Sequence, residues 1–287
     1  MARAHKRPGA GAPEAPAPSI GEAVAERLAE KTEASRLAGR PKQLLLAFAG
    51  GAYVAFGVAF AVAVSNGIPW DGIQRLLFGV AFAAGFIMVF IGEGLLATEL
   101  HVSMPFVVFR NRATARQVAR DVGFWALVYV GNAVGTLFVA YLLSASQTFH
   151  GEPMARLTAK VMEGLRYEEL GPYGWYACVL HGIAGNWLVG LAAFIAESSP
   201  TTAGKVIGVV FPVATFEALG FQHLTSSMAF FHTGILSGVP VGYGEFLAWN
   251  LAPTTLGNVI GGAVFVGFLY RYTHVLEAGR ERSGVAR

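Results

Sequence analysis

Cysteine and charged residues are both scarce in this chain. Cys178 is the single cysteine, which excludes a disulfide framework within the chain and any metal site built from several cysteines. Charged residues make up 14% of the sequence, whereas a soluble globular domain has about 25%. Apolar residues make up 54%. A chain with so few charges and so many apolar side chains is predicted to be an integral membrane protein.

The two ends of the chain lack long apolar runs. The N-terminal end is rich in Ala, Pro and Gly without the apolar segment of a secretory signal, so we expect a disordered cytoplasmic tail over residues 1–18. Ser19 and Glu22 fit a capping box, and apolar residues follow at helical spacing. An amphipathic helix is therefore predicted over residues 19–41, lying on the membrane surface or on the protein's own cytoplasmic face. Residues 276–287 form a second predicted cytoplasmic tail.

Between these ends lie apolar stretches that are long enough to cross a bilayer, whose hydrocarbon core of about 30 Å needs about 20 helical residues. The six stretches are Leu44–Ser65, Leu76–Ala97, Val122–Leu143, Tyr176–Ala196, Val206–Leu236 and Phe246–Tyr272. The fifth stretch is overlong and contains Gly220, and the second runs into the polar segment Glu93–His101. We therefore predict an all-α membrane protein with six transmembrane helices, of which the second and the fifth are interrupted.

The basic residues predict how the chain is oriented. Lys and Arg gather before the first stretch, after the second, before the fifth and at the end of the chain, and cytoplasmic segments carry this excess in membrane proteins. An even number of spans places both termini on one side, which is then predicted to be cytoplasmic. Residues 144–173 would form an external, partly helical segment. Because the basic residues follow the pattern of membrane topology, no nucleic-acid partner is predicted.

A short motif occurs in both the third and the sixth stretch. GNAVGTLFVAYL from Gly131 and GNVIGGAVFVGFLY from Gly257 share G-N-x-x-G before an apolar run. Each half of the chain holds an odd number of spans, so a second copy would be inserted upside down, which gives an inverted 3+3 repeat. A chance match is the alternative, since glycine is common in membrane helices. Interruptions at equivalent places in the second and fifth spans favour the repeat.

Polar residues surround the interruption of the fifth stretch. The segment FEALGFQHLTSSM begins at Phe216 and includes Glu217, Gln222 and His223. An ionisable residue at mid-bilayer costs about 2.5 to 3.5 kcal/mol on insertion scales, so it normally faces a cavity or a partner. Unwound backbone around Gly220 is tolerated only where protein or water satisfies its polar groups. The interruption is therefore predicted to line a pathway, with His223 at the start of a half-helix that favours an anion.

Each of these residues also has an ordinary structural explanation. His223 can be a neutral core histidine bonded to a carbonyl. Glu217 can be protonated, paired with His181 or turned toward a subunit interface, and the sequence pattern does not choose among these. His101 and His232 are expected to lie nearer the membrane surfaces.

Longer segments of the chain resemble the formate/nitrite transporter family. They are PVATFEALGFQHLTSSM from Pro212, NWLVGLAAF from Asn186, LVYVGNAVG from Leu127 and NLAPTTLGNVIGG from Asn250. The similarity covers roughly residues 44–274. It implies an aquaporin-like protomer with six spans, assembled into a homopentamer in which each protomer has its own pore for small monovalent anions such as formate, nitrite, hydrosulfide or lactate. Residues 42–275 would then be the transporter domain.

The resemblance also implies roles for individual residues. His223 matches the central pore histidine of the family, and Asn186 and Asn258 match asparagines near it. Phe216 matches an aromatic residue of the constriction beside that histidine.

An ungapped alignment extends these roles to the second span. It places Phe82 and Phe86 on the other constriction. It also aligns LATE, from Leu96 to Glu99, with the family's L-F-T loop, so Thr98 is the loop threonine and Leu96 joins the predicted pathway.

The chain departs from the family pattern at several positions. Gln222 stands where the family usually has a glutamate before the histidine, and Glu217 is an additional acid beside the aromatic constriction. The loop around Leu96 lacks the acid and the phenylalanine that usually flank its leucine. A basic residue near the external end of the fourth span has no clear equivalent, and Lys160 and His181 are the candidates. These departures bear on which anion the chain transports and not on which fold it adopts.

The predicted function is transport of small monovalent anions of the formate/nitrite class across the cell (inner) membrane. Desolvation in a dry pore favours the neutral form of such an anion. We therefore expect the anion to accept a proton, in the vestibule or by way of His223, which makes transport proton-coupled. The predicted partners are the anion, the proton and membrane lipid. No metal-ligand spacing and no nucleophile with a nearby base stands out, so neither an enzyme nor a cofactor nor a metal site is predicted.

The alternative function is a membrane scaffold or sensor that keeps the transporter fold but has little transport activity. In that case the N-terminal tail would bind a soluble partner.

Overall fold

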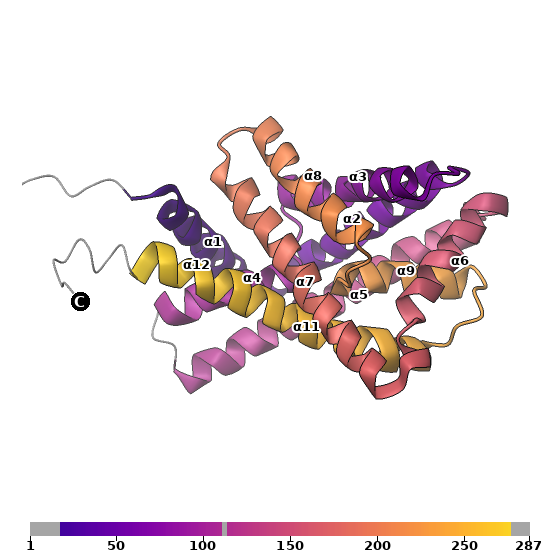
Figure 1. The fold of residues 1–287 in the computed structure, drawn as a ribbon. Coiled ribbons are helices and arrows are strands. Elements are labelled where there is room, and N and C mark those ends of the chain that lie inside the picture. The colour runs from indigo at the N-terminus through magenta and orange to yellow at the C-terminus, as the bar shows by residue number, and fades with distance from the viewer. Residues whose placement is uncertain (1–17, 111–113, 277–287) are drawn as a thin grey trace, which may run out of the picture.

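The computed structural model describes residues 18–110 and 114–276, and over these residues it is built of helices and connecting turns, without strands (Figure 1). Its segments of sufficient length and apolarity to cross a membrane are Arg40–Ser65, Asp71–Ile91, Ala115–Ala145, Gly151–Ser198 and Tyr243–Leu276. This confirms an all-helical protein with several membrane-spanning helices. The two predicted tails, apart from residues 18 and 276, lie outside the described residues.

In the first half of the chain, the described residues form five helices. They are α1 (Ile20–Leu37), α2 (Arg40–Ser65), α3 (Asp71–Ile91), α4 (Ala97–Arg110) and α5 (Ala115–Ala145). The predicted third span, Val122–Leu143, lies within the longer α5. Helix α2 packs against α3 and α5.

The second half begins with the segment that was predicted to be external. It contains α6 (Gly151–Leu165) and a short 3-10 turn at Glu168–Leu170, followed by α7 (Gly171–Ser198), α8 (Thr202–Ala218) and α9 (Leu224–Leu236). Helix α7 packs against α8 and α11, as α2 packs against α3 and α5. Helix α6 and helix α1 lie at opposite ends of the molecule (Figure 1).

The last helix is continuous but irregular. It comprises α10 (Tyr243–Glu245), a π-helical segment at Phe246–Leu251, α11 (Ala252–Gly262), a second π-helical segment at Ala263–Phe268, α12 (Leu269–Arg271) and a third at Tyr272–Leu276. Pro253 lies in the first turn of α11. Proline lacks the N–H that would continue the hydrogen bonds of a regular helix, which accounts for the change of winding before α11.

Helix α1 lies on the protein itself and not on the open membrane surface. Ser19 and Glu22 form the predicted capping box at its start. Its buried side chains, Val24 and Leu28 among them, belong to a cluster with Phe106 of α4. The predicted helix over 19–41 ends earlier, at Leu37, because the next helix already begins at Arg40 and has Pro41 in its first turn.

Two five-residue breaks interrupt the helices at corresponding places. Residues 92–96 separate α3 from α4, and residues 219–223 separate α8 from α9. Glu93 (φ 56°) and Gly220 (φ 68°) take the left-handed conformation at the second position of their breaks. At the third position, the N–H of Gly94 and the N–H of Phe221 each donate to a carbonyl five residues back, both at 3.0 Å. The two interruptions thus share one backbone path.

The asparagines of the two G-N-x-x-G motifs hold these breaks. Asn132 accepts a hydrogen bond from the N–H of Ala97, the first residue of α4, and donates to the carbonyl of Leu95 (2.9 and 2.7 Å). Asn258 accepts one from the N–H of Leu224, the first residue of α9, and donates to the carbonyl of Gln222 (2.8 and 3.0 Å). Backbone groups that the breaks leave free are therefore satisfied by protein, as a membrane interior requires.

The last glycine of each motif permits close helix contact. A Cβ atom at Gly135 of α5 would overlap the carbonyl oxygen of Phe48 in α2, and one at Gly261 of α11 would overlap that of Ile183 in α7. Small residues allow membrane helices to approach this closely. The motifs therefore fix the distance between paired helices and also position the breaks.

Candidate functional site

His223 occupies the N-cap position of α9, directly after the second break. Its side chain is 1% exposed. Nδ1 of the ring lies 3.0 Å from Oγ of Ser226, and Nε2 is buried without a hydrogen-bond partner among the described residues. The histidine is thus not the core residue bonded to a carbonyl that the sequence also allowed. One ring nitrogen is thus held in place, while the other makes no hydrogen bond with the described residues.

Three buried phenylalanines stand on one side of this imidazole. Phe86 of α3 and Phe216 of α8 lie 5.2 and 5.7 Å from the His223 ring, measured between ring centroids. Phe82 lies 5.5 Å from Phe86 and 5.9 Å from Phe216, at steep interplanar angles. All three rings are fully buried. The structure therefore brings the predicted constriction residues together beside the histidine, on the two helices that precede the breaks.

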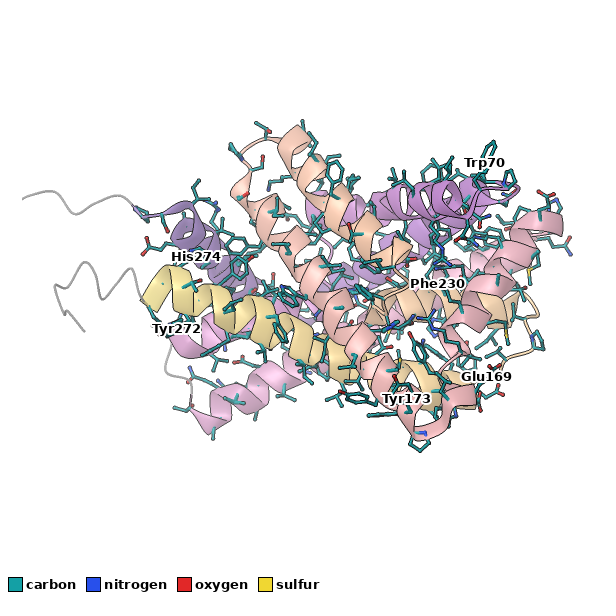
Figure 2. The ribbon with its side chains drawn as sticks, in the orientation of Figure 1. Trp70, Glu169, Tyr173, Phe230, Tyr272 and His274 are labelled. Atoms are coloured by element: carbon teal, nitrogen blue, oxygen red, sulfur yellow. The ribbon has the colours of Figure 1, made fainter. Side chains whose placement is uncertain are left out.

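The aromatic row continues toward α6. Phe78 of α3 and Phe230 of α9 lie 5.9 Å apart, and Phe230 lies 6.1 Å from Phe82. Phe230 is in the interior of the molecule, in contrast to the peripheral Trp70 and Tyr173 (Figure 2). Lys160 of α6 places its Nζ 4.8 Å from the centre of the Phe78 ring, within the range of a cation–π contact.

A small cavity of about 30 Å³ has both Lys160 and His223 in its lining, together with Glu217, Gln222 and Ser226. This is about the volume that one water molecule occupies in the liquid. Polar side chains of α6, α8 and α9 thus meet at one small cavity beside the phenylalanine row.

Glu217 pairs with Lys160 and not with His181. Its Oε2 lies 3.3 Å from Nζ of Lys160, and the two side chains are 5% and 10% exposed. His181 instead places Nδ1 2.9 Å from the hydroxyl of Tyr167 and 3.0 Å from NH2 of Arg166. Lys160 is therefore a basic residue at this end of the row that is paired with Glu217. It comes from α6, whereas the family pattern has a basic residue near the external end of the fourth span.

Gln222 lies at the inner edge of the cavity. Its Oε1 accepts a hydrogen bond from Nδ2 of Asn250 (2.9 Å), and its Nε2 donates to the carbonyl of Gly220 (3.3 Å). The amide thus bridges the break and the last helix.

The remaining predicted residues form a network behind His223. Asn186 donates to the carbonyls of Asn258 (2.8 Å) and Thr98 (3.3 Å), and so connects the start of α4 with the asparagine that caps α9. Thr98 is fully buried, and its Oγ1 has no partner among the described residues. Leu96 is 1% exposed and ends the first break, in the position that His223 holds in the second.

Residues 20–272 match the sequence profile of the formate/nitrite transporter family. The chain belongs to the formate/nitrite transporter family.

Individual members of the formate/nitrite transporter family are similar over most of their length. The chain is 30% identical over 273 residues to the formate channel FocA of Haemophilus influenzae, covering 85% of this chain and 91% of that one. It is 30% identical over 237 residues to the formate channel BtFdhC of Bacillus thuringiensis, covering 80% and 86%. A solved structure described as a pentameric formate channel with formate bound superposes with a TM-score of 0.70 at 27% identity, covering 81% of this chain and 96% of that chain.

The expectation that His101 and His232 lie nearer the membrane surfaces stays a prediction, but both side chains are buried within the protein. They are 6% and 7% exposed. Nε2 of His101 lies 2.7 Å from Nε1 of Trp125, which donates to it, and His232 places Nδ1 2.9 Å from the hydroxyl of Thr136.

Sequence reasoning also left Asn132, Phe78 and Phe230 out of the site. Asn132 was visible in the G-N-x-x-G motif, and its equivalence to Asn258 could have assigned it. Phe78 precedes Phe82 by one helical turn, and this spacing extends the row that Phe82 and Phe86 begin. Phe230 carried no comparable signal, because its position depends on where α9 starts.

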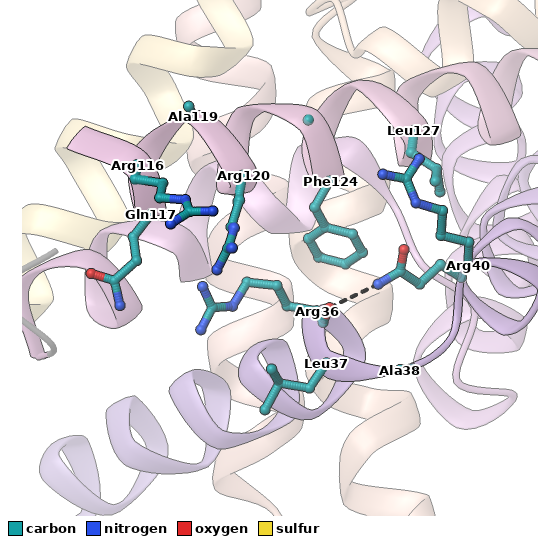
Figure 3. A pocket seen from close by; sticks show the side chains of 12 residues that line it. Arg36, Leu37, Ala38, Arg40, Arg116, Gln117, Ala119, Arg120, Phe124 and Leu127 are labelled. Carbon is teal, nitrogen blue, oxygen red and sulfur yellow. Dashed lines mark hydrogen bonds between the residues drawn. The ribbon is translucent and has the colours of Figure 1, made fainter. Parts of the chain in front are cut away.

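A larger pocket of about 900 Å³ lies on the surface and not on this pathway (Figure 3). It is bounded by the end of α1, the start of α2 and the first turns of α5. Four arginines line it, namely Arg36, Arg40, Arg116 and Arg120. Arg36 pairs with Asp121 (2.9 Å). Such a gathering of basic side chains at one end of the helices is typical of the cytoplasmic face of a membrane protein.

Proposed function

We propose that this protein transports small monovalent anions of the formate/nitrite class through a pore in each protomer, with His223 at its centre. The observation that carries the proposal is the buried imidazole at the start of α9, whose Nε2 has no partner among the described residues and whose ring abuts Phe86 and Phe216. An apolar constriction next to one free polar group selects for a small solute that can lose its water.

The architecture behind this pore is an inverted repeat of two three-span halves. Its support is the equivalence of the two breaks, which have the same length, the same left-handed position and the same asparagine cap. In this arrangement α8 and α9 together form the fifth of six spans, although neither alone is long enough to cross. The protomers assemble as a homopentamer, as in the pentameric formate channel that the chain resembles.

The orientation follows from the charges. The end that carries α1 and the arginine pocket faces the cytoplasm, and both termini lie on that side. Helix α6 lies on the external side of the membrane. Arg36, Arg40, Arg116 and Arg120 support this assignment, because an excess of basic residues marks cytoplasmic segments.

Transport begins with an anion at the α6 side, where Lys160 offers a positive charge. The phenylalanine row removes water from the anion, and removal of water favours the neutral acid over the charged form. A proton from the vestibule or by way of His223 neutralises the anion, and the acid passes the constriction of Phe82, Phe86 and Phe216. Transport is then coupled to protons. The chain catalyses no covalent reaction on this route.

Uptake into proteoliposomes tests the proposal. Formate, nitrite, hydrosulfide, acetate and lactate are offered at an external pH of about 5 and about 7, values on the two sides of the usual histidine pKa of about 6.5, with protein-free liposomes as the control. We expect uptake of at least one of these anions above the control, with a higher rate at the lower pH. If none of them enters faster than into empty liposomes, the protein is not such a transporter, and a scaffold or sensor with the same fold becomes the better explanation.

A further inference from the structure

The pair formed by Glu217 and Lys160 has an unusual place in the molecule. Glu217 lies in the last turn of α8, next to Phe216 of the constriction, and Lys160 reaches it from α6. Both line the cavity that His223 also lines. A glutamate side chain ends in the same planar carboxylate group that formate and acetate carry. The chain therefore places a carboxylate of its own against the Lys160 ammonium group at the end of the phenylalanine row.

Other charged groups near the pair do not take over this role. Glu163 also contacts Lys160 (3.1 Å), but it is more exposed, at 24%, and it lies 3.3 Å from Arg166 and 3.8 Å from Arg75. Glu163 thus shares its charge among three cations. Arg156 faces the Phe78 ring at 5.2 Å. Glu217, at 5% exposure and paired with Lys160, is the deeper acid.

We infer that Lys160 forms a binding site for a monocarboxylate and that the Glu217 carboxylate is its resting occupant. An incoming anion must displace Glu217 from Lys160 before it reaches the phenylalanine row. The inference rests on the proposed function, because it assigns a substrate class and a competing group to the mouth of that pore. The additional acid of this chain then has a role. Because Glu217 competes for Lys160, it weakens binding of the anion, and the site releases the anion toward the constriction.

The geometry favours a carboxylate over a spherical anion. Oε2 of Glu217 lies 3.3 Å from Nζ, so a carboxylate already occupies this site in the folded chain. The adjacent rings of Phe78 and Phe230, with centroids 4.8 and 5.7 Å from Nζ, provide an apolar wall for the single carbon or methyl group of formate or acetate. Chloride and hydrosulfide would leave part of this site unfilled.

Uptake kinetics test the competition. Glu217→Gln keeps the shape of the side chain and removes its charge, so we expect the KM for formate in proteoliposomes to fall about tenfold, the ratio that corresponds to ~1.4 kcal/mol. Glu163→Gln is the matched control, because it removes the charge of another acid that contacts Lys160, three residues further along the chain. We expect the KM of this variant to change by less than about twofold, which corresponds to ~0.4 kcal/mol. An unchanged KM in Glu217→Gln, or an equal fall in both variants, would overturn the inference.

A binding measurement that does not depend on transport separates this inference from the proposed function. Glu217→Ala leaves Lys160 without its buried partner and opens space for a small carboxylate. Sodium acetate should therefore raise the Tm of the purified variant above the Tm in sodium chloride at equal ionic strength, since a ligand that binds the folded state stabilises it. The wild type and Glu163→Ala should show no such difference, and Lys160→Met in the Glu217→Ala background should abolish it.

The two measurements give distinguishable failures. If the wild type carries no anion but acetate stabilises Glu217→Ala, the proposed function fails and the carboxylate site stands. If the wild type carries formate but acetate and chloride stabilise Glu217→Ala equally, the transporter stands and the inference fails.

Discussion

His223 shows how one side chain can be both fixed and available. Ser226, one turn along α9, holds Nδ1, while Nε2 points away from any partner among the described residues. The sequence predicted that this histidine would follow a break, and the structure confirms that position. The sequence did not predict the contact with Ser226. This serine, three residues after the histidine, faces the ring only when His223 is the N-cap of α9.

Gln222 tests whether a neighbouring charge influences the histidine. Gln222→Glu introduces a carboxylate beside His223, and a nearby negative charge favours the protonated imidazole. We expect the pH at which formate uptake is half-maximal to move upward by about one unit, the shift that ~1.4 kcal/mol of interaction produces. Uptake into proteoliposomes between pH 4 and 8 measures this. An identical pH profile would show that the two side chains are not coupled.

The capping asparagines can be compared directly. Asn258→Ala leaves the N–H of Leu224 without its acceptor, and Asn132→Ala does the same for Ala97. An unsatisfied buried polar group costs about 1 to 3 kcal/mol, so each variant should lower the Tm in detergent measurably. Asn66→Ala is the control, since Asn66 bonds only to carbonyls of its own helix end. Equal Tm values for Asn258→Ala and Asn66→Ala would show that the cap is dispensable.

At the scale of elements, the two breaks were predictable in part. Gly220 marked the second break in the sequence, since glycine adopts the left-handed conformation without strain. The first break has Glu93 in that conformation, and no residue type announces it. The polar run from Glu93 to His101 gave only its approximate place. Helix α1 could likewise be predicted as amphipathic, but its docking on α4 depends on contacts far apart in the sequence.

Gly220 should not tolerate a side chain. Its φ of 68° is strained for other residues, and a Cβ there would lie 2.9 Å from Oε1 of Glu163. Gly220→Ala is therefore expected to lower stability by about 1 kcal/mol or more. Gly72→Ala in α3 is the matched control, because a Cβ there meets no atom within 4 Å and alanine favours helix. Thermal unfolding in detergent compares the two; a Gly220→Ala variant as stable as Gly72→Ala would contradict the left-handed turn.

The docking of α1 should depend on pH at the alkaline end. The Glu99 carboxylate, 3.2 Å away, and that of Glu197 raise the pKa of Lys31 above its ordinary value of 10.5, and partial burial opposes them. A raised pKa in the folded state means that the stabilisation is complete below about pH 10.5 and is lost as the pH rises through the folded value.

Three proteins compared by thermal unfolding test this dependence. We expect Lys31→Gln to be less stable than the wild type by about 1 kcal/mol from pH 7 to pH 10. The difference should shrink above pH 10.5, while Lys31→Arg keeps its stability because guanidinium stays protonated there. A difference that is constant up to pH 12 would argue against a contribution from the lysine's charge.

At the scale of the whole molecule, the surface of one protomer indicates an assembly. Large apolar side chains are exposed along α2, α3 and α5, including Phe60, Leu76 and Tyr141. Lipid and neighbouring protomers can both cover such a surface. We expect native mass spectrometry of detergent-released protein to give five times the 30.4 kDa of the chain. A monomer or dimer as the main species would contradict the pentamer.

The candidate site within one protomer could be predicted further than the assembly. The aromatic residues and the histidine were identified in the sequence, and in the structure neighbouring rings of this group lie 5.2 to 6.1 Å apart, measured between centroids. Lys160 was harder to assign, since α6 is separated in sequence from both breaks and its lysine reaches Glu217 only in the folded chain. Contacts between segments that are distant in the sequence cannot be predicted from the pattern of apolar and polar residues.

The central claim is that anions cross beside His223 and depend on its imidazole. Formate uptake by proteoliposomes containing the wild type or His223→Ala, measured from pH 4 to 8 at equal protein incorporation, tests it most directly. The account predicts that wild-type uptake rises as the external pH falls, and that the variant either loses this dependence or loses uptake by at least about tenfold, equivalent to ~1.4 kcal/mol in the barrier. A variant that carries formate at the wild-type rate with the wild-type pH profile would contradict the account.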